Sequence, residues 1–206
     1  MDEASRTLIS TFLQLISSWY SPPLILFSLL LFYHTFEASY AFLTNRREFG
    51  WVSFLISKPY AIAMTVGFSE FFIEAYFFRS LTLRLLPLSY VGILAACTGL
   101  LIRFGAMLQN TTGFTHLIST KKRDDHALVT TGFYAICRHP AYMGWFLFSV
   151  ASQIILCNPV SFIAYAFVSW KFFANRIPYE EVYLRQFFGH QYAAYAKRTW
   201  SGIPFV

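Results

Sequence analysis

Long apolar segments separated by shorter polar ones make up most of this chain of 206 residues. The apolar segments lie at about 8–43, 60–78, 88–108 and 143–173. A helix rises about 1.5 Å per residue, so each of the two middle segments is long enough to cross a bilayer once. The last segment contains Asn158-Pro159 near its middle. We therefore expect a tight helical hairpin or two tilted spans there, which return the chain to the side from which it entered.

The first apolar segment is interrupted by Pro22-Pro23. The part after the prolines is long enough to span a membrane, whereas the part before them could form a half-span, an interfacial helix or a separate crossing. The number of crossings before Tyr60 is therefore open. The whole pattern predicts an all-α, polytopic membrane protein of about five to six transmembrane helices. Residues 1–206 are expected to form a single integral membrane domain.

The composition supports this class of protein. Hydrophobic residues make up 56% of the chain and charged residues 13%, whereas soluble domains carry roughly 25% charged residues. The net charge of +6 comes from basic residues scattered between apolar segments. This arrangement favours attachment to an anionic lipid leaflet over binding to nucleic acid. The three cysteines have no metal-ligand spacing, so we expect no metal site.

Several ionisable residues lie inside the apolar segments, where such groups normally face other helices. His34 and Glu37 are three residues apart and are best read as polar clamps between helices. Glu70 and Glu74 lie one turn apart. They could serve acid–base chemistry or pair with a base on a neighbouring helix, and pairing is favoured because an unpaired buried charge is costly. Arg103 could be that partner or could extend toward the membrane interface.

The turn before the third span is expected to be short, marked by Arg79 and Arg84 and ending at Pro87. The next polar segment, 109–138, is the longest and carries Lys121-Lys122-Arg123. The positive-inside tendency places it in the cytosol. Its basic cluster could attract a polar cofactor or contact anionic lipid, and the second reading is favoured.

Polar residues crowd the stretch from His126 to Trp145, at the edge of an apolar segment. Pro140 is expected to begin a helix, since helices tolerate and favour proline in their first turn. Free backbone N–H groups at that helix end would then lie beside Arg138 and His139 and suit a ligand with anionic or polar groups. The alternative is an interfacial anchor, because such residues often lie at headgroup level without chemistry.

The tail, 175–206, is polar and aromatic and is expected on the same side as the 109–138 segment. Arg176 and Glu180 are one helical turn apart, a spacing that alone is typical of a surface pair. The positions of Phe188, Tyr192 and Tyr195 predict a helix that covers an apolar opening. The hairpin should bring this tail and the 109–138 segment together.

The run GFYAICRHPAYMGW, then LCNPVSF, then RIPYEEVYLRQFFGHQYAAYAKR and IPF, resembles the isoprenylcysteine carboxyl methyltransferase family. The resemblance runs from about residue 88 to the tail and, more weakly, back to His34. The RHPxYxG motif alone is shared by a wider group of membrane methyltransferases and sterol reductases. Its combination with PYEE, FGxxYxxY and IPF is much more specific.

The resemblance implies a multi-pass enzyme of the endoplasmic-reticulum membrane with its active site facing the cytosol. It would use S-adenosyl-L-methionine to methylate the C-terminal prenylcysteine carboxylate of prenylated CaaX-type proteins such as small GTPases. Arg176 would hold the substrate carboxylate, and Arg176 and Glu180 would be the catalytic residues. The residues implied to bind the cofactor are His126, Ala127, Leu128, Val129, Tyr134, His139, Pro140, Ala141, Tyr142 and Glu180. Some members have a cofactor-binding Gln where this chain has Ser119, so that contact is not carried over.

Three other functions compete with this interpretation. A phospholipid N-methyltransferase would share the cofactor, but its amine nucleophile must lose a proton and has no use for an arginine clamp such as Arg176. A non-catalytic membrane scaffold or channel subunit would leave the polar residues of 126–142 without a ligand. A sterol reductase would need a nicotinamide site, and no dinucleotide fingerprint is present.

Overall fold

A computed structural model of the chain describes residues 21–44, 46, 49–122, 124 and 126–206. Within these ranges the protein is helical, and its one β contact is a parallel bridge between Cys137 and Trp200. The elements in chain order are α2 (Ser21–Thr44), the 3-10 helix η1 (Trp51–Phe54), α3 (Lys58–Phe77), α4 (Arg79–Gln109), α5 (Phe133–Ile136), α6 (Pro140–Leu156) and α7 (Pro159–Arg198). The part of the first apolar segment before Ser21 lies outside the described residues.

Three segments of the described chain are long and apolar enough to cross a membrane, at 21–44, 51–77 and 84–109. The apolar helix α6 is shorter, with 17 residues. Large hydrophobic side chains on these helices, such as Leu31, Ile62 and Leu94, are exposed on the outside of the bundle, as expected for surfaces that face lipid. The prediction of an all-helical, polytopic membrane protein is confirmed, and the number of five to six spans stays a prediction.

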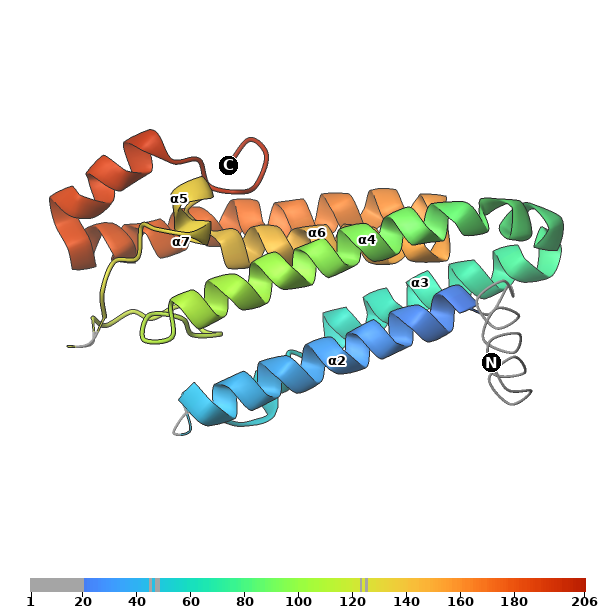
Figure 1. Ribbon diagram of the computed structural model, residues 1–206, viewed down its shortest axis with the longest axis horizontal. Helices are drawn as coiled ribbons and strands as arrows, with labels where there is room; N and C mark the ends of the chain where they lie inside the picture. Colours follow the sequence, from blue (N-terminus) through green and yellow to red (C-terminus); the bar gives the residue numbers. More distant parts are fainter. Residues whose placement is uncertain (1–20, 45, 47–48, 123, 125) are drawn as a thin grey trace, which may run out of the picture.

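Helix α4 packs along α6, and α6 packs against α7. These three helices form one part of the molecule, and α2 and α3 form the other (Figure 1). Glycines allow α4 and α6 to approach very closely. A Cβ atom at Gly99 would lie 2.7 Å from the carbonyl oxygen of Gly144, and one at Gly144 would lie 2.5 Å from that of Gly99. Small residues commonly permit such contact between membrane helices. The crossing holds the first turns of α6 directly against α4.

The aromatic core lies between α2, α4 and α6. The ring of Tyr33 stacks on Phe148 at 5.4 Å and on Phe104 at 6.2 Å between centroids. These rings and Leu26 are almost fully buried, so the core ties the two halves of the bundle together.

The helical hairpin at Asn158-Pro159 is confirmed, because α6 ends at Leu156 and α7 begins at Pro159. Glu70 of α3 stabilises this turn. Its carboxylate accepts hydrogen bonds from the backbone N–H groups of Val160 at 2.8 Å and Ser161 at 2.7 Å. A carboxylate at a helix N-terminus satisfies free amides and complements the helix dipole. The prediction that Glu70 pairs with a basic side chain is therefore wrong.

The polar clamps predicted for α2 are confirmed. His34 contacts the carbonyl oxygen of Phe54 and the hydroxyl of Tyr60, each at 2.7 Å. Glu37 forms an ion pair with Arg103 of α4. Both readings of Arg103 are therefore wrong: it neither reaches the interface nor pairs with Glu70 or Glu74. Arg103 is 5% exposed, because the helix packing brings it to the level of Glu37 inside the bundle.

The turn between the second and third spans is shorter than predicted. Helix α4 begins at Arg79 and continues through Pro87, so the prediction of a turn ending at Pro87 is wrong. Proline removes one backbone donor, and membrane helices tolerate this because neighbouring groups satisfy the freed carbonyl. The direction changes at Phe78 instead, whose N–H donates to the carbonyl of Glu74 at 2.7 Å.

Helix α7 bends sharply at Gly189, where φ is 51° and ψ is −124°. No heavy atom lies within 4 Å of the position that a Cβ would take there. Glycine is thus required by the backbone conformation and not by lack of space. After the bend the rest of α7 turns back toward α5 and the C-terminal residues (Figure 1). This return forms one wall of the candidate site.

Candidate functional site

A pocket lies at the end of the bundle where the 110–131 loop, the start of α6 and the second half of α7 meet. It holds about 800 Å³ of empty space, part of which is continuous with solvent. The pocket is therefore an open cleft and not a closed cavity.

The structure brings the predicted cofactor residues together. All of them line this pocket: His126, Ala127, Leu128, Val129, Tyr134, His139, Pro140, Ala141, Tyr142 and Glu180. Ser119, which the sequence analysis left out, also lines it. Arg176 lies directly beside the pocket and not in its lining. The roles of these residues in binding stay predictions.

The hydroxyl of Tyr142 joins the two predicted catalytic residues. It donates a hydrogen bond to Glu180 Oε2 at 2.6 Å and accepts one from Arg176 Nε at 2.9 Å. The Arg176 guanidinium also lies over the Tyr142 ring, 5.4 Å from its centroid. The His139 ring is parallel to the Tyr142 ring within 5° at 5.5 Å between centroids. Arg176 and His139 therefore both contact Tyr142 and lie at one site.

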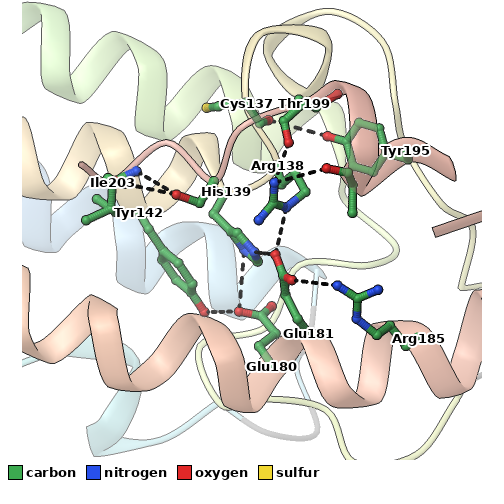
Figure 2. A network of polar contacts seen from close by, with 12 residues as sticks. Cys137, Arg138, His139, Tyr142, Glu180, Glu181, Arg185, Tyr195, Thr199 and Ile203 are labelled. Carbon is green, nitrogen blue, oxygen red and sulfur yellow. Dashed lines mark hydrogen bonds and ion pairs between the residues drawn. The ribbon is translucent and has the colours of Figure 1, made fainter. Parts of the chain in front are cut away.

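A second cluster surrounds the carboxylate of Glu181 (Figure 2). Oε1 accepts a hydrogen bond from Arg138 Nε at 2.7 Å and lies 3.3 Å from His139 Nε2, and Oε2 lies 3.4 Å from Arg185 Nη2. Burial alone would raise the pKa of Glu181, but the hydrogen bonds from His139 and Arg138 and the positive charge of Arg138 outweigh it and lower the pKa to about 2. Glu181 is therefore ionised at neutral pH and holds Arg138 and His139 in place.

Backbone contacts from the tail fix the same motif. The N–H groups of Arg138 and His139 donate to the carbonyl oxygens of Trp200 at 2.8 Å and Ser201 at 2.9 Å. The Arg138 guanidinium also donates to the carbonyl of Thr199 (Figure 2). Two segments about sixty residues apart in the sequence thus lie side by side, and one of them carries the pocket residues Arg138 and His139.

Tyr195 adds a contact from α7. Its hydroxyl donates to the carbonyl of Tyr134 at 2.5 Å, which holds the returning end of α7 against α5. Burial raises the pKa of the Tyr134 hydroxyl to about 12, so this pocket residue is neutral at physiological pH.

The first turn of α6 offers fewer free amides than its sequence suggested. Pro140 does begin the helix, as predicted. The N–H groups of Tyr142 and Met143, however, both donate to the carbonyl of His139 at 3.0 Å. The polar groups that this turn presents to the pocket are therefore side chains.

Lys122 contacts protein, and the favoured prediction that the basic cluster contacts anionic lipid stays a prediction. Its ammonium donates to the carbonyl of Phe187 at 3.0 Å and lies 5.2 Å from the centroid of the Phe188 ring. These contacts attach the 110–131 loop to α7 just before the bend. Arg123 lies outside the described residues.

Arg138 and Glu181 were missed as site residues by the sequence analysis. Arg138 was considered there only as a neighbour of the helix that Pro140 begins and within the RHPxYxG motif, and Glu181 only within the PYEE motif. One signal was available, since a charged residue directly before a buried helix needs a partner of opposite charge. The identity of that partner depends on how α7 lies against α6, which the local sequence does not contain.

The fold and site define a polytopic membrane protein with a polar, partly enclosed pocket at one end of its helical bundle. The model of the isoprenylcysteine carboxyl methyltransferase (ICMT) family matches residues 91–186. Protein-S-isoprenylcysteine O-methyltransferase B of Arabidopsis thaliana is 44% identical over 182 residues, which cover 88% of this chain and 92% of that protein. The protein-S-isoprenylcysteine O-methyltransferase of Dictyostelium discoideum is 44% identical over 174 residues, covering 84% of this chain and 73% of the relative.

A solved structure of the eukaryotic intramembrane Ras methyltransferase ICMT is also similar, with a TM-score of 0.87 and 38% identity. The match covers 91% of this chain and 68% of that one. The chain belongs to the isoprenylcysteine carboxyl methyltransferase family and is an enzyme, a membrane methyltransferase.

Proposed function

We propose that this enzyme uses S-adenosyl-L-methionine to methylate the α-carboxylate of a C-terminal prenylcysteine in CaaX-processed proteins such as small GTPases. The proposal places it in the endoplasmic-reticulum membrane, with the pocket facing the cytosol and about five to six crossings. One observation carries it: the Tyr142 hydroxyl bonds to both Glu180 and Arg176. Glu180, which suits the cofactor, and Arg176, which suits a carboxylate, are thereby held on either end of hydrogen bonds to the same hydroxyl.

The pocket residues fit the proposed cofactor. The lining combines apolar positions such as Leu128 and Val129 with the faces of Tyr134 and Tyr142 and the carboxylate of Glu180. Glu180 can accept hydrogen bonds from an ammonium or from ribose hydroxyls, and aromatic faces attract a sulfonium. When bound, S-adenosyl-L-methionine supplies the methyl group as part of a sulfonium cation.

Arg176 is proposed to orient the acceptor. A terminal α-carboxyl has a pKa of roughly 3.3–3.7, so it is ionised at neutral pH and needs no general base. Guanidinium can hold a carboxylate through two parallel N–H donors, which lysine cannot reproduce. Tyr142 and the carbonyl of His116 already hold Arg176, at 2.9 and 2.8 Å. A guanidinium fixed in this way positions the nucleophilic oxygen without moving a proton.

Exclusion of water is the other proposed contribution of the protein. The acceptor is anionic and the donor cationic, and water stabilises separated charges more than the dispersed charge of the transition state. The 110–131 loop, attached to α7 through Lys122 and Phe187, and the end of α7, attached through Tyr195, cover the pocket. The prenyl chain is proposed to enter from lipid between the apolar helices.

The direct test is methyl transfer in membranes that contain this chain. We expect transfer of labelled methyl from S-adenosyl-L-methionine to N-acetyl-S-farnesylcysteine and none to phosphatidylethanolamine. The opposite preference would support a phospholipid N-methyltransferase and contradict the proposal. Transfer to neither acceptor would favour a protein without this activity.

Two variants separate the proposed roles. Arg176→Ala should raise KM for the prenylcysteine and leave displacement of labelled S-adenosylhomocysteine near normal. Glu180→Ala should weaken that displacement, since it removes the proposed cofactor contact. Equal loss of cofactor binding in both variants would contradict the division of roles.

A further inference from the structure

A buried ionic cluster lies inside the helical bundle, outside the pocket lining. Glu37 of α2 pairs with Arg103 of α4 through Oε1 and with His116 Nε2 through Oε2 at 2.8 Å. Glu37 is completely buried and Arg103 is 5% exposed. Burying ionised groups is costly unless their partners and hydrogen bonds are nearly complete. A cluster at this depth therefore fixes the position of every group that it holds.

Of these three groups, only His116 belongs to the pocket loop. Its imidazole is attached to Glu37, and its ring packs edge-on against Phe114 at 5.7 Å. Phe114 in turn packs against Tyr40 and lies 5.9 Å from the Arg103 guanidinium. Since Phe114 lines the pocket, the cluster sets the position of this part of the loop relative to α2 and α4.

The backbone of His116 points the other way, toward α7. Its carbonyl oxygen accepts a hydrogen bond from Arg176 Nη2 at 2.8 Å, while Arg176 Nε donates to Tyr142. These two bonds use two of the five N–H donors of a guanidinium and leave three for a bound carboxylate. The direction of the remaining donors therefore depends on where the His116 carbonyl lies.

We propose that His116, held by Glu37 from inside the bundle, is a positioning residue that orients the Arg176 guanidinium through its backbone carbonyl. This inference rests on the proposed function, in which Arg176 holds the substrate carboxylate. Fixing the guanidinium before the substrate arrives removes an ordering cost from binding. A misplacement of about 1 Å at such a group can reduce the rate by roughly 100-fold.

The test uses His116→Ala in the full chain in membranes. This variant keeps the carbonyl but removes the imidazole that attaches it to Glu37. We expect KM for N-acetyl-S-farnesylcysteine to rise on the order of tenfold, with near-normal displacement of labelled S-adenosylhomocysteine. His116→Gln should restore KM, because its amide N–H can replace Nε2–H as donor to Glu37. His190→Ala, at an exposed histidine of α7, is the matched control and should behave as wild type.

A double variant tests the route of the effect. If His116 acts through Arg176, His116→Ala should change KM no further in an Arg176→Ala background, since coupled residues are not additive. Additive effects would overturn the proposal, as would a wild-type KM in His116→Ala. Equal loss of cofactor binding and methyl transfer in both His116 variants would also overturn it, because His116 would then serve general packing. An inactive wild-type protein would refute the proposed function itself, and the inference with it.

Discussion

Two carboxylates lie near the pocket, and each pairs with at least one arginine and one histidine. Glu37 lies inside the bundle, where it is completely buried and Arg103 is only 5% exposed. Glu181 lies on α7 with 11% of its side chain exposed, and its third partner, Arg185, is 53% exposed. A glutamate paired with an arginine and a histidine thus occurs once in the buried interior and once at a partly solvent-exposed position. The cost of losing one partner should differ accordingly, because water can replace a partner only at the solvent-exposed position.

The largest difference is expected from Glu37→Leu, which leaves Arg103 as a buried, unpaired charge. Breaking such a pair costs about 3–5 kcal/mol, measured as a lower Tm of the detergent-solubilised protein. Replacing both partners, as Glu37→Leu with Arg103→Met, should recover most of this stability, because apolar groups of similar size need no partner. A double variant with a Tm as low as that of the single variant would mean that the instability does not come from the unpaired charge of Arg103.

Glu181→Gln should lower the free energy of unfolding by less, about 1–3 kcal/mol. Arg138 keeps its backbone carbonyl partners in this variant and lies near solvent. The cost should depend on pH. The pKa of Glu181 is lowered to about 2, whereas an unfolded glutamate titrates near 4.3. The stabilisation is therefore complete above about pH 4.5 and is lost as the pH falls toward 2. The difference in Tm between wild type and Glu181→Gln should shrink from pH 6 to pH 3, and a constant difference would contradict this.

Tyr195→Phe removes the hydroxyl that donates to the carbonyl of Tyr134 at 2.5 Å and lies 3.4 Å from the carbonyl oxygen of Cys137. A hydrogen bond of this kind contributes about 1 kcal/mol. We expect a small decrease in Tm together with weaker displacement of labelled S-adenosylhomocysteine, because α7 closes one wall of the pocket. Tyr76→Phe, at an exposed tyrosine of α3, is the control and should leave cofactor binding unchanged.

The smallest effect is expected from Arg185→Ala. The Arg185–Glu181 contact is a helical pair four residues apart with an exposed arginine, and such pairs contribute about 0.3–0.5 kcal/mol. Its contribution should disappear at high salt, whereas that of the Glu37–Arg103 pair should not. A loss of stability as large as that of Glu181→Gln would show that Arg185 is the main partner of the carboxylate.

The parts of the fold that local patterns determine could be predicted from the sequence. Apolar length gave the spans, and Asn158-Pro159 gave the hairpin that brings the loop and tail together. The hairpin topology predicted that the two polar segments meet. The resemblance then assigned motif residues such as His139 and Tyr142 to a shared cofactor site and indicated the ligand that they are proposed to bind.

Partners across helices could not be predicted. The spacing of Glu37 shows that it needs a partner, but the choice of Arg103 depends on the axial register of α2 against α4. That register is set by packing over the whole interface, including the contact of Gly99 with Gly144. Glu70 was misjudged for a related reason, since its partners are backbone amides of α7 and carry no side-chain signal in the sequence.

The contacts of Arg138 and His139 with the carbonyls of Trp200 and Ser201 have a consequence for biosynthesis. Trp200 and Ser201 are synthesised only after every described apolar helix. Pocket assembly is therefore a late event that follows insertion into lipid, and a chain shortened before Thr199 would keep its spans but lack a finished site. Such a chain should insert into the membrane normally, and a ligand-binding assay should show that it does not bind.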